Sequence, residues 1–379
     1  MSTTPDLLYS ETEDELRSAL RGLLADRCDP ASVIARTETD EPYDPALWKA
    51  LGADMGLAGL LVPEELGGQG ATHREAAVVL EELGRSVAPV PYLTSAVIAT
   101  EVLLSGGTKG GAADQGLGEV AAELLTELAA GRRIAVLALP WTTAPGARIA
   151  GVRQQGGRLH GRITGVADAV AADTLLIPAD GALYAVETGA EGVTVTAQTV
   201  LDPTRPTAVV ELNGAPARVI ADGEQVSELA VRTGLSAGAG LLASEQLGLA
   251  DWCLTETVSH TRERHQFNRP VGSFQALKHR MAELWLEVVN SRAAARNAAD
   301  ALATAGDERA LAVSLAQSYC APVAVRVAEE ALQLHGGIGM TWEHPVHLYL
   351  KRAKSDSLAL GSAGHHRDVI AGLVNLAAP

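Results

Sequence analysis

The spacing of apolar residues divides this chain of 379 residues into three regions. In residues 1–133, leucines such as Leu16, Leu20 and Leu24 recur at helical intervals between charged neighbours, which is the pattern of amphipathic helices. Thr72 is followed three residues later by Glu75, the spacing of a capping box, and this pair predicts the start of one helix. We therefore expect residues 1–133 to form a helical N-terminal domain.

The pattern changes at Ile134, where short apolar runs replace the helical period. Turn residues separate these runs, as at Gly156-Gly157 and Asn213-Gly214, and short runs bounded by turns are typical of β-strands. The runs cover residues 134–139, 158–166, 174–177, 182–186, 192–197 and 207–212. Residues 134–225 are therefore expected to form a small antiparallel β domain.

Helical periodicity returns in residues 226–379. The pattern predicts long helices over residues 227–265, 274–305, 307–335 and 346–359. Small residues from Gly234 to Gly240 lower helix propensity, so they indicate close approach of another backbone. The expected fold is mainly α, with a central β domain between an N-terminal helical domain and a C-terminal four-helix bundle.

Composition excludes several classes of function. Thirty Lys and Arg against 46 Asp and Glu give a net charge of −16, which repels nucleic acid backbones. There is no basic leader segment and no run of about 20 apolar residues, so we expect a cytoplasmic protein with no membrane association. The cysteines Cys28, Cys253 and Cys320 have neither metal-ligand nor redox spacing and are expected to be free thiols.

Three separated motifs carry a family resemblance. They are Arg264-His265-Gln266-Phe267 with Phe274-Gln275, Gln333-Leu334-His335-Gly336-Gly337, and Val62-Pro63-Glu64-Glu65-Leu66-Gly67-Gly68. Together they resemble, in order and over essentially the whole chain, the acyl-CoA dehydrogenase family of flavoproteins. Asn268 stands where that family usually has glycine, so the resemblance does not settle the conformation of the local turn.

The resemblance implies FAD, shared at a subunit interface, as the cofactor. A guanidinium such as Arg264 suits a pyrophosphate, and Gly336 and Gly337 allow backbone N–H groups to approach it closely. By resemblance, one set of residues holds the ADP half of the neighbouring subunit's flavin. This set, called the clamp below, is Arg264, Gln266, Phe267, Phe274, Gln275, Gln333, Gly336 and Gly337.

The family's reaction needs a carboxylate base to remove the proton α to the thioester, and none stands at the expected position. The family's register puts that base at Leu360, and an alternative register used by some relatives falls near Gly238. Glu245 and Asp356 are the nearest acids and could substitute. Because neither has a partner or spacing that would tune its pKa, we interpret both as surface or core-edge carboxylates.

The β domain also departs from the family at the place where the flavin ring lies. Pro140 is retained, but the tryptophan that covers the ring corresponds to Gly165 and the neighbouring threonine to Ala167. By resemblance, the chain therefore lacks the residues that a subunit supplies to its own flavin. It keeps the residues that a subunit supplies to its neighbour's flavin.

Our leading hypothesis is a subunit of an FAD-dependent acyl-CoA dehydrogenase without a catalytic base of its own. It resembles the heteromeric bacterial members, some of which act on bulky steroid side-chain thioesters. The resemblance implies three partners: an acyl-CoA thioester, a catalytic partner subunit and an electron-transfer flavoprotein. Two alternatives stay open. One is a self-sufficient flavin-fold enzyme that uses Asp356 or Glu245 or performs other acyl-thioester chemistry, and the other is a flavin-free scaffold or binding protein of the same fold.

Other candidate groups have simpler interpretations. His344, His347, His365 and His366 lie close in sequence but lack the i,i+4 pairing flanked by acids of helical zinc sites, so we expect no metal site. The paired acids Glu64-Glu65 and Glu81-Glu82 are interpreted as solvated faces.

Overall fold

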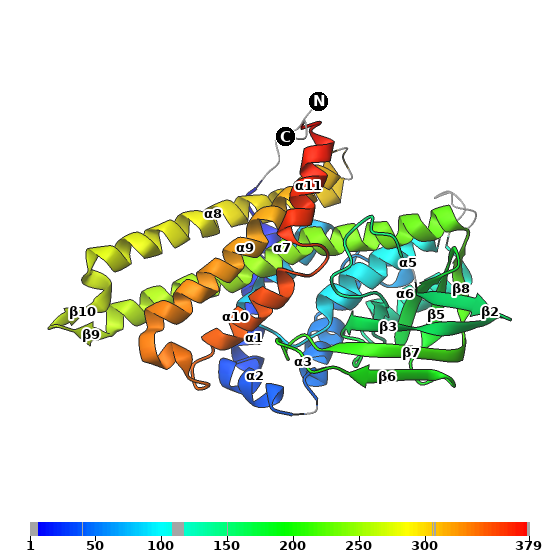
Figure 1. The fold of residues 1–379 in the computed structure, drawn as a ribbon, viewed down its shortest axis with the longest axis horizontal. Coiled ribbons are helices and arrows are strands. Elements are labelled where there is room, and N and C mark those ends of the chain that lie inside the picture. Colours follow the sequence, from blue (N-terminus) through cyan, green and yellow to red (C-terminus); the bar gives the residue numbers. More distant parts are fainter. Residues whose placement is uncertain are drawn as a thin grey trace.

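The computed structural model describes residues 7–39, 41–107, 117–149, 151–304, 306 and 308–376. Figure 1 shows the long helix α7, Glu224–Glu263, running through the middle of the molecule from a β domain at one end to a hairpin at the other. The N-terminal helices cover one side of α7, and the C-terminal helices cover another. The expected fold class is confirmed.

The N-terminal region consists of short helical segments. They are α1 Glu11–Arg27, α2 Pro30–Thr37, α3 Pro45–Lys49, η1 Ala50–Asp54, η2 Leu57–Gly59, η3 Glu64–Leu66, α4 His73–Arg85, η4 Tyr92–Ala99, α5 Thr100–Gly106 and α6 Glu119–Ala129. The predicted capping box is present at α4, where the Thr72 side chain accepts from the backbone and Glu75 bonds back to the cap. Satisfying these otherwise unpaired N–H groups fixes the start of the helix.

Helix α4 lies unusually close to α7. A β-carbon on Gly84 would be 2.2 Å from the Glu245 carbonyl oxygen, and one on Gly248 would be 2.0 Å from the Glu81 carbonyl oxygen. Only glycine permits backbones to approach this closely. The predicted small-residue patch behaves similarly, because a β-carbon on Gly234 would be 2.8 Å from the Ile98 carbonyl oxygen.

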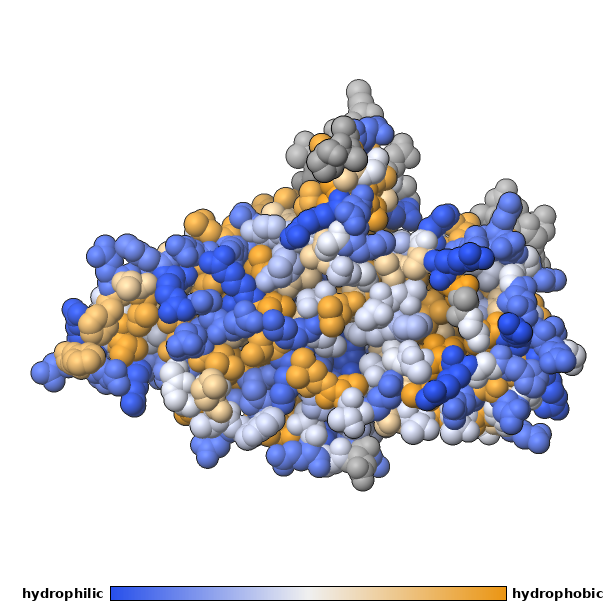
Figure 2. All heavy atoms as spheres, in the orientation of Figure 1, coloured by the Kyte–Doolittle hydropathy of each residue, from blue (hydrophilic) through white to orange (hydrophobic). Residues whose placement is uncertain are grey.

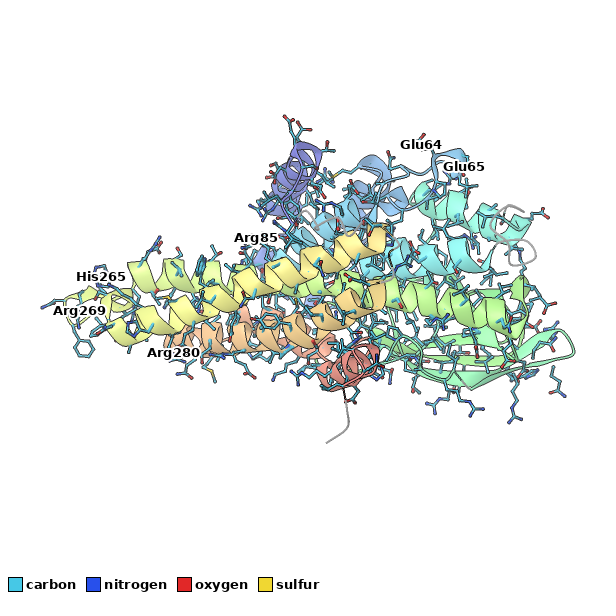
Figure 3. The ribbon with its side chains drawn as sticks, turned by 90° about the horizontal axis from the view of Figure 1, so that it is seen from above. Glu64, Glu65, Arg85, His265, Arg269 and Arg280 are labelled. Atoms are coloured by element: carbon cyan, nitrogen blue, oxygen red, sulfur yellow. The ribbon has the colours of Figure 1, made fainter. Side chains whose placement is uncertain are left out.

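The paired acids of α4 differ from the sequence interpretation. Glu81 and Glu82 are buried, and they form ion pairs with Arg17 and Arg21 of α1. The interpretation as a solvated face was therefore wrong for this pair, because α1 packs over it and brings its own arginines. Glu64 and Glu65 are exposed, as expected, and lie at the periphery of the molecule in Figure 3.

Two four-stranded sheets form the β domain. The strands are β1 Ala135–Leu137, β2 Val152–Gln155, β3 Arg158–Ala167, β4 Thr174–Ala179, β5 Ala182–Glu187, β6 Val193–Ala197, β7 Thr207–Pro216 and β8 Arg218–Asp222. One sheet has the order β1-β4-β5-β8 and the other β2-β3-β7-β6. All pairs within these sheets are antiparallel except β1 with β4, which is parallel. The apolar runs missed β2 and β8, whose residues are mostly exposed.

The C-terminal region is the helical bundle. Its elements after α7 are the hairpin β9 His265–Gln266 and β10 Arg269–Pro270, η7 Val271–Ser273, α8 Gln275–Thr304, α9 Arg309–His335, η8 Gly336–Met340, α10 Val346–Asp356 and α11 Ala363–Leu373. The predicted ends of the three longest helices fall within three residues of the observed ones. Helix α9 packs against α7, α8, α10 and α11.

The segment Arg309–Met340, α9 with η8, is by length and composition apolar enough to cross a membrane. A mostly buried core helix of a soluble protein passes the same criterion, and 56% of its most apolar window is buried inside this fold. Its position in the centre of the bundle accounts for its composition.

Candidate functional site

The position at which the family carries its base lies in the turn after α10. Leu360 is 1% exposed, and its backbone N–H donates to the Trp141 carbonyl oxygen at 2.9 Å. Its φ of 52° is in the left-handed region, which is uncommon for a branched residue. A β-carbon on Gly238 of α7 would lie 3.2 Å from Leu360 Cδ1. The two candidate base positions thus face each other, and neither carries a carboxylate.

The cavity beside Leu360 is small, and it is called the closed cavity below because its lining side chains leave little space in it. Its volume is about 20 Å³, roughly the space that one water molecule needs. It is lined by Thr94, Ile98, Leu137, Leu139, Pro140, Trp141, Ala167, Leu235 and Leu360. Thr94 is the one lining residue with a hydroxyl, and that hydroxyl donates to Asp168 at 2.7 Å. The cavity offers no carboxyl oxygen among its lining residues and no room for a planar ring system.

Glu245 and Asp356, the two possible substitute bases, are not surface or core-edge residues. They are 1% and 0% exposed, so that interpretation was wrong. Glu245 binds Arg205 at 2.7 Å and Arg352 at 2.6 Å, and Asp356 binds Arg205 at 2.8 Å. Both carboxyls can be buried because they pair with Arg205, which reaches them from the loop between β6 and β7. Helix periodicity in the sequence could not predict the position of this loop residue.

These residues belong to a larger buried ionic network. Arg352 of α10 also binds Asp202 at 2.6 Å and both oxygens of Thr204. The network joins the β6–β7 loop to α7 and α10, so it holds the β domain against the bundle. Arg205 additionally lies 5.2 Å from the ring centroid of Trp141, which connects the network to the closed cavity.

The charges of the network do not balance if every acid is ionised. Two arginines, Arg205 and Arg352, face the carboxyls of Asp202, Glu245 and Asp356. Although burial opposes it, attraction to both arginines lowers the pKa of Glu245. Burial, followed by repulsion from Glu245, raises the pKa of Asp356 well above its ordinary value. The ion-pair geometry alone would make both ionised, but the charge count favours a protonated Asp356 and an ionised Glu245.

Asp168 is a further buried acid that the sequence interpretation gave no role. It follows Ala167 directly, and burial raises its pKa although Arg205 and the Thr94 hydroxyl act in the opposite direction. Its backbone has a φ of 56°. Its side chain accepts a hydrogen bond from Thr94, which lines the closed cavity, so Asp168 lies behind that cavity. No local sequence pattern marks the bond of Asp168 to Thr94 or the ion pairs of Asp202 and Arg205, since these partners lie 40 or more residues away along the chain.

The clamp residues gather at the opposite end of α7. Phe267 and Asn268 form a two-residue hairpin loop between β9 and β10, with φ values of 53° and 57°. Positive φ at both positions is what such a loop requires, and asparagine tolerates it. The substitution of Asn268 for the family's glycine therefore leaves the turn intact. Figure 3 shows His265 and Arg269 of this hairpin at the tip of the molecule.

The second half of the clamp lies at the end of α9, on the same side of the bundle. The rings of His260 in α7 and His335 in α9 are 4.5 Å apart, so the two helix ends are neighbours. Arg264, Gln266, Gln275 and Gln333 are exposed. In the described part of the chain, none of their side chains forms a hydrogen bond or ion pair, and they are free to receive a ligand.

Gly336 and Gly337 face open space. A β-carbon on either residue would meet nothing within 4 Å, and Gly337 has no positive φ that would exclude other residues. Packing within the described chain thus gives no reason for glycine at position 337. An open face beside exposed donors is what close approach of another molecule requires.

Large hydrophobic side chains surround this end of the bundle. Phe267 is 84% exposed, and Ile338, Met340 and Trp342 are exposed as well. Figure 2 shows hydrophobic residues on the surface at the hairpin end, where the bundle projects away from the β domain. Exposed apolar surface of this kind is typical of a protein contact.

The clamp and the closed cavity are far apart. Gly238 faces the cavity and Arg264 follows the last residue of α7, 26 residues further along the chain. At a rise of about 1.5 Å per residue the separation is roughly 39 Å. This distance exceeds the reach of one extended dinucleotide, so the two sites cannot serve the same FAD molecule.

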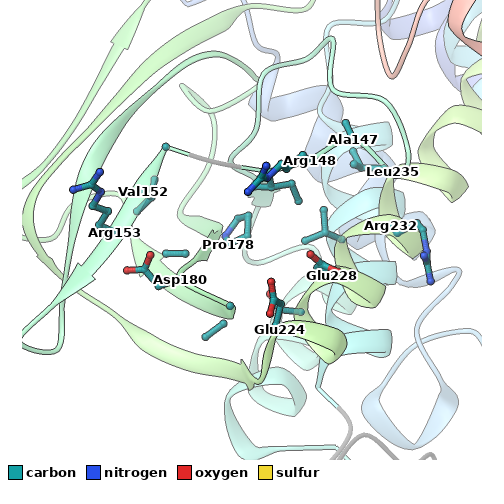
Figure 4. A pocket seen from close by; sticks show the side chains of 18 residues that line it. Ala147, Arg148, Val152, Arg153, Pro178, Asp180, Glu224, Glu228, Arg232 and Leu235 are labelled. Atoms are coloured by element: carbon teal, nitrogen blue, oxygen red, sulfur yellow. The ribbon is translucent and has the colours of Figure 1, made fainter.

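A second, larger cavity has a volume of about 760 Å³ and lies between β2, β4 and the first turns of α7. Its lining includes side chains of both charges, which Figure 4 labels. The positive ones are Arg148, Arg153 and Arg232, and the negative ones are Asp180, Glu224 and Glu228. Three arginines against three acids leave no net charge to attract a polyphosphate. Leu235 lines both this cavity and the closed one.

Of the histidines considered above, His366 contacts the former base position. It is buried, and its Nε2 lies 3.0 Å from the Leu360 carbonyl oxygen. His344 lies beside His335 instead, with ring centroids 4.3 Å apart, and burial lowers the pKa of His344 to about 4.

Two family models match the chain. The N-terminal domain of acyl-CoA dehydrogenases matches residues 10–112, and the C-terminal domain matches residues 229–374. The chain belongs to the acyl-CoA dehydrogenase family. This confirms the family inferred from the three motifs.

Curated relatives and solved structures agree with this assignment. Acyl-CoA dehydrogenase IpdE2 of Mycolicibacterium smegmatis is 36% identical over 93% of this chain and 95% of its own length. FadE27 of Mycobacterium tuberculosis is 33% identical over 94% and 95%. A chain of the ChsE4–ChsE5 complex from Mycobacterium tuberculosis aligns with a TM-score of 0.83 at 29% identity, covering 99% of this chain and 100% of that one. A chain of the Tcur3481–Tcur3483 steroid ACAD variant aligns with a TM-score of 0.82 at 27% identity, covering 96% of this chain and 98% of that one.

Members of the acyl-CoA dehydrogenase family bind FAD, and the two ends of this chain fit that cofactor differently. The closed cavity beside Leu360, at about 20 Å³, does not fit the isoalloxazine ring. The exposed clamp, with its free guanidinium at Arg264 and the open face over Gly336 and Gly337, fits the pyrophosphate half.

Proposed function

We propose that this chain is the subunit of a heteromeric acyl-CoA dehydrogenase that carries no catalytic base. In this proposal a catalytic partner subunit holds the flavin ring and the base. The present chain supplies the clamp, led by Arg264 and Gly337, to the ADP half of the partner's FAD. The assembly would catalyse α,β-desaturation of an acyl-CoA thioester in the cytoplasm and pass electrons to an electron-transfer flavoprotein.

The observation that carries the proposal is that Gly238 and Leu360 face each other. A β-carbon on Gly238 would lie 3.2 Å from Leu360 Cδ1, and Leu360 lines the cavity, so the two positions from which the family delivers a base carry a hydrogen atom and an isobutyl group here. Proton abstraction needs a carboxylate within hydrogen-bond reach of the α carbon. The cavity is also too small for the flavin ring, so base and ring site are missing together.

The separation of the two ends supports a role toward a neighbour. The roughly 39 Å along α7 between Gly238 and Arg264 means that the clamp has no flavin to hold within its own subunit. The exposed hydrophobic residues around the clamp, such as Phe267 and Trp342, suit a surface that a partner covers.

The similar structures suggest both the assembly and the substrate class. One is a complex of two different proteins, ChsE4 and ChsE5, and another is the Tcur3481–Tcur3483 steroid ACAD, which also carries two protein names. By analogy with the latter, we infer a bulky or steroid side-chain thioester as the substrate of the assembly.

A self-sufficient enzyme that uses Glu245 or Asp356 as base is less well supported. Both carboxyls point to Arg205, and neither lines the cavity beside Leu360. Freeing either one would break a buried ion pair with Arg205. A flavin-free scaffold would account for the closed cavity but gives no reason for a glycine at position 337.

The experiment is to co-express the chain with a catalytic acyl-CoA dehydrogenase subunit from the same organism and to compare Arg264→Ala with Arg262→Ala. Arg262 is also exposed, two residues earlier on α7, and controls for the loss of a surface cation. We expect Arg264→Ala to release flavin from the complex while Arg262→Ala retains it. Equal flavin retention by the two variants would count against the clamp, and activity of the isolated wild-type chain would refute the missing base.

A further inference from the structure

Three segments that are distant in sequence bring potential metal ligands together next to the clamp. Glu256 comes from α7, His335 is the last residue of α9, and His344 lies in the loop before α10. Their ligand atoms all lie within 4.8 Å of one another. The spacing of the histidines in the sequence could not predict this group, because His335 and His344 meet Glu256 only in the folded chain.

His335 is held in the state that a metal ligand needs. Its Nδ1 lies 2.6 Å from the Ala331 carbonyl oxygen, which can only accept a hydrogen bond, so Nδ1 carries the proton. Nε2 is then an unprotonated acceptor. A backbone carbonyl at Nδ1 is the usual second partner of a metal-binding histidine, since it fixes the tautomer and orients the ring.

The Nε2 atom of His335 has no partner in the described part of the chain. His335 is 4% exposed, and Nε2 is buried without a hydrogen bond. A buried acceptor that is left unpaired costs free energy. Ligand atoms of Glu256, His335 and His344 all lie within 4.8 Å of one another, so a cation bound among the three through Nε2 would offset that cost.

We propose that Glu256, His335 and His344 form a Zn²⁺ site that braces the clamp. Two imidazoles and one carboxylate are a common zinc ligand set, which leaves one coordination position for water. Tetrahedral bonds of about 2.0–2.2 Å place the ligand atoms about 3.4 Å apart. Glu256 and His344 are only partly buried, so their side chains can rotate inward to reach that spacing around the fixed His335.

The remaining contacts of these side chains do not oppose binding. The Nδ1 atom of His344 accepts from the Val346 N–H at 3.3 Å, and a contact of this length is weak. The ring of His260 lies 4.5 Å from that of His335, but His260 is not part of the group of three. No ion pair ties Glu256 to an arginine or lysine within the described residues.

Zinc at this position would act on the clamp through the chain itself. His335 directly precedes Gly336 and Gly337, and Glu256 stands two turns before Arg264 on α7. A metal that joins α7, α9 and the loop before α10 would therefore fix both halves of the clamp relative to each other. This role is independent of whether a partner's flavin is bound.

The test is metal content and Co²⁺ spectroscopy of the full-length chain. The purified protein is stripped with a chelator, dialysed against Zn²⁺ and measured for bound metal, and Co²⁺ is added separately as a visible probe. We expect one Zn²⁺ per chain and the intense absorption of tetrahedral Co²⁺. The variants are His335→Gln, His344→Ala and Glu256→Gln, with His347→Gln as the matched control.

The variants separate a site from loss of structure. Glu256 is partly exposed, so Glu256→Gln is expected to fold even if the buried His335→Gln does not, and zinc binding should fall at least tenfold. His347→Gln removes a nearby histidine outside the group and should bind zinc as the wild type does. The proposal is overturned if the wild-type chain binds no zinc, or if Glu256→Gln and His344→Ala bind it as tightly as the wild type.

Discussion

Gly238 faces the Leu360 side chain across the place where an acyl-CoA dehydrogenase keeps its base, and there is no room between them for a larger residue at position 238. A β-carbon on Gly238 would lie 3.2 Å from Leu360 Cδ1 and 2.7 Å from the side chain of Ile98. Any larger residue at 238 would have to displace these side chains. The two residues therefore close the site sterically as well as removing its chemistry.

Restoring a carboxylate at this point should not create an enzyme. Leu360→Glu would bury an unpaired acid at a position that is 1% exposed, and we expect a loss of about 3–5 kcal/mol in the free energy of unfolding. Burial raises the pKa of such a group, so the loss should grow as the pH rises above about 4.3. Urea unfolding at several pH values measures this loss.

The volume-conserving variant Leu360→Met is the control, and it should cost less than about 1.5 kcal/mol. We also expect no flavin-dependent turnover from isolated Leu360→Glu, because the cavity has no room for the ring. Turnover by that isolated variant would contradict the closed site.

The two acids of the buried network should respond differently to neutralisation. Glu245→Gln removes the carboxylate shared by Arg205 and Arg352 and should cost about 3–5 kcal/mol. Asp356→Asn copies the protonated form that burial already favours, and should cost about 1 kcal/mol or less. Urea unfolding at neutral pH distinguishes them, and equal losses would show that our assignment of the charges is wrong.

The pH dependence follows from the lowered pKa of Glu245. A carboxyl whose pKa is lower in the folded protein stabilises it above the unfolded pKa of about 4.3, and this contribution is lost as the pH falls through the folded value. Wild-type stability should therefore decline in acid more steeply than that of Glu245→Gln. Parallel declines would indicate that Glu245 is not ionised in the folded chain.

The glycines at the clamp predict a contrast between two neighbouring alanine substitutions. Gly337→Ala meets nothing within 4 Å, so the stability of the isolated chain should change by no more than about 0.5 kcal/mol, whereas the complex should lose flavin. Gly339→Ala places a β-carbon 2.6 Å from the Leu332 carbonyl oxygen and should destabilise the chain itself by about 1–3 kcal/mol. Thermal unfolding and flavin absorbance give the two readouts. Unchanged flavin in the Gly337→Ala complex would argue against close approach there.

Helix contact between α4 and α7 should depend on glycine in the same direct way. Gly248→Ala would put a β-carbon 2.0 Å from the Glu81 carbonyl oxygen, and the required separation of the helices should cost about 3 kcal/mol or more. Gly22→Ala in α1 meets nothing and should gain up to about 1 kcal/mol from helix propensity. Urea unfolding of both variants measures the difference, and a stable Gly248→Ala would mean that the helices separate at little cost.

The parts of the fold that depend on local pattern were predictable. The cap at Thr72 and the ends of α7 follow from residues within a few positions of each other, where side-chain periodicity and capping act. The parallel pairing of β1 with β4 was not predicted, since it depends on segments about 40 residues apart. The exposed strands β2 and β8 gave no apolar run to detect.

The candidate site divides in the same way. Leu360 and the clamp could be assigned because they stand in motifs with fixed spacing. Arg205 could not, because its partners Glu245 and Asp356 lie 40 and 151 residues away and no local rule pairs them. For the same reason Glu256, His335 and His344 were not recognised as a group.

The central claim is that this chain holds a partner's flavin and has none of its own. The most direct measurement is the molar ratio of FAD to polypeptide in the complex purified with its partner, with the chain ratio determined by quantitative amino-acid analysis. We expect one FAD for every two polypeptides, and essentially none in this chain purified alone. One FAD for every polypeptide, or a flavin-loaded and active isolated chain, would contradict it.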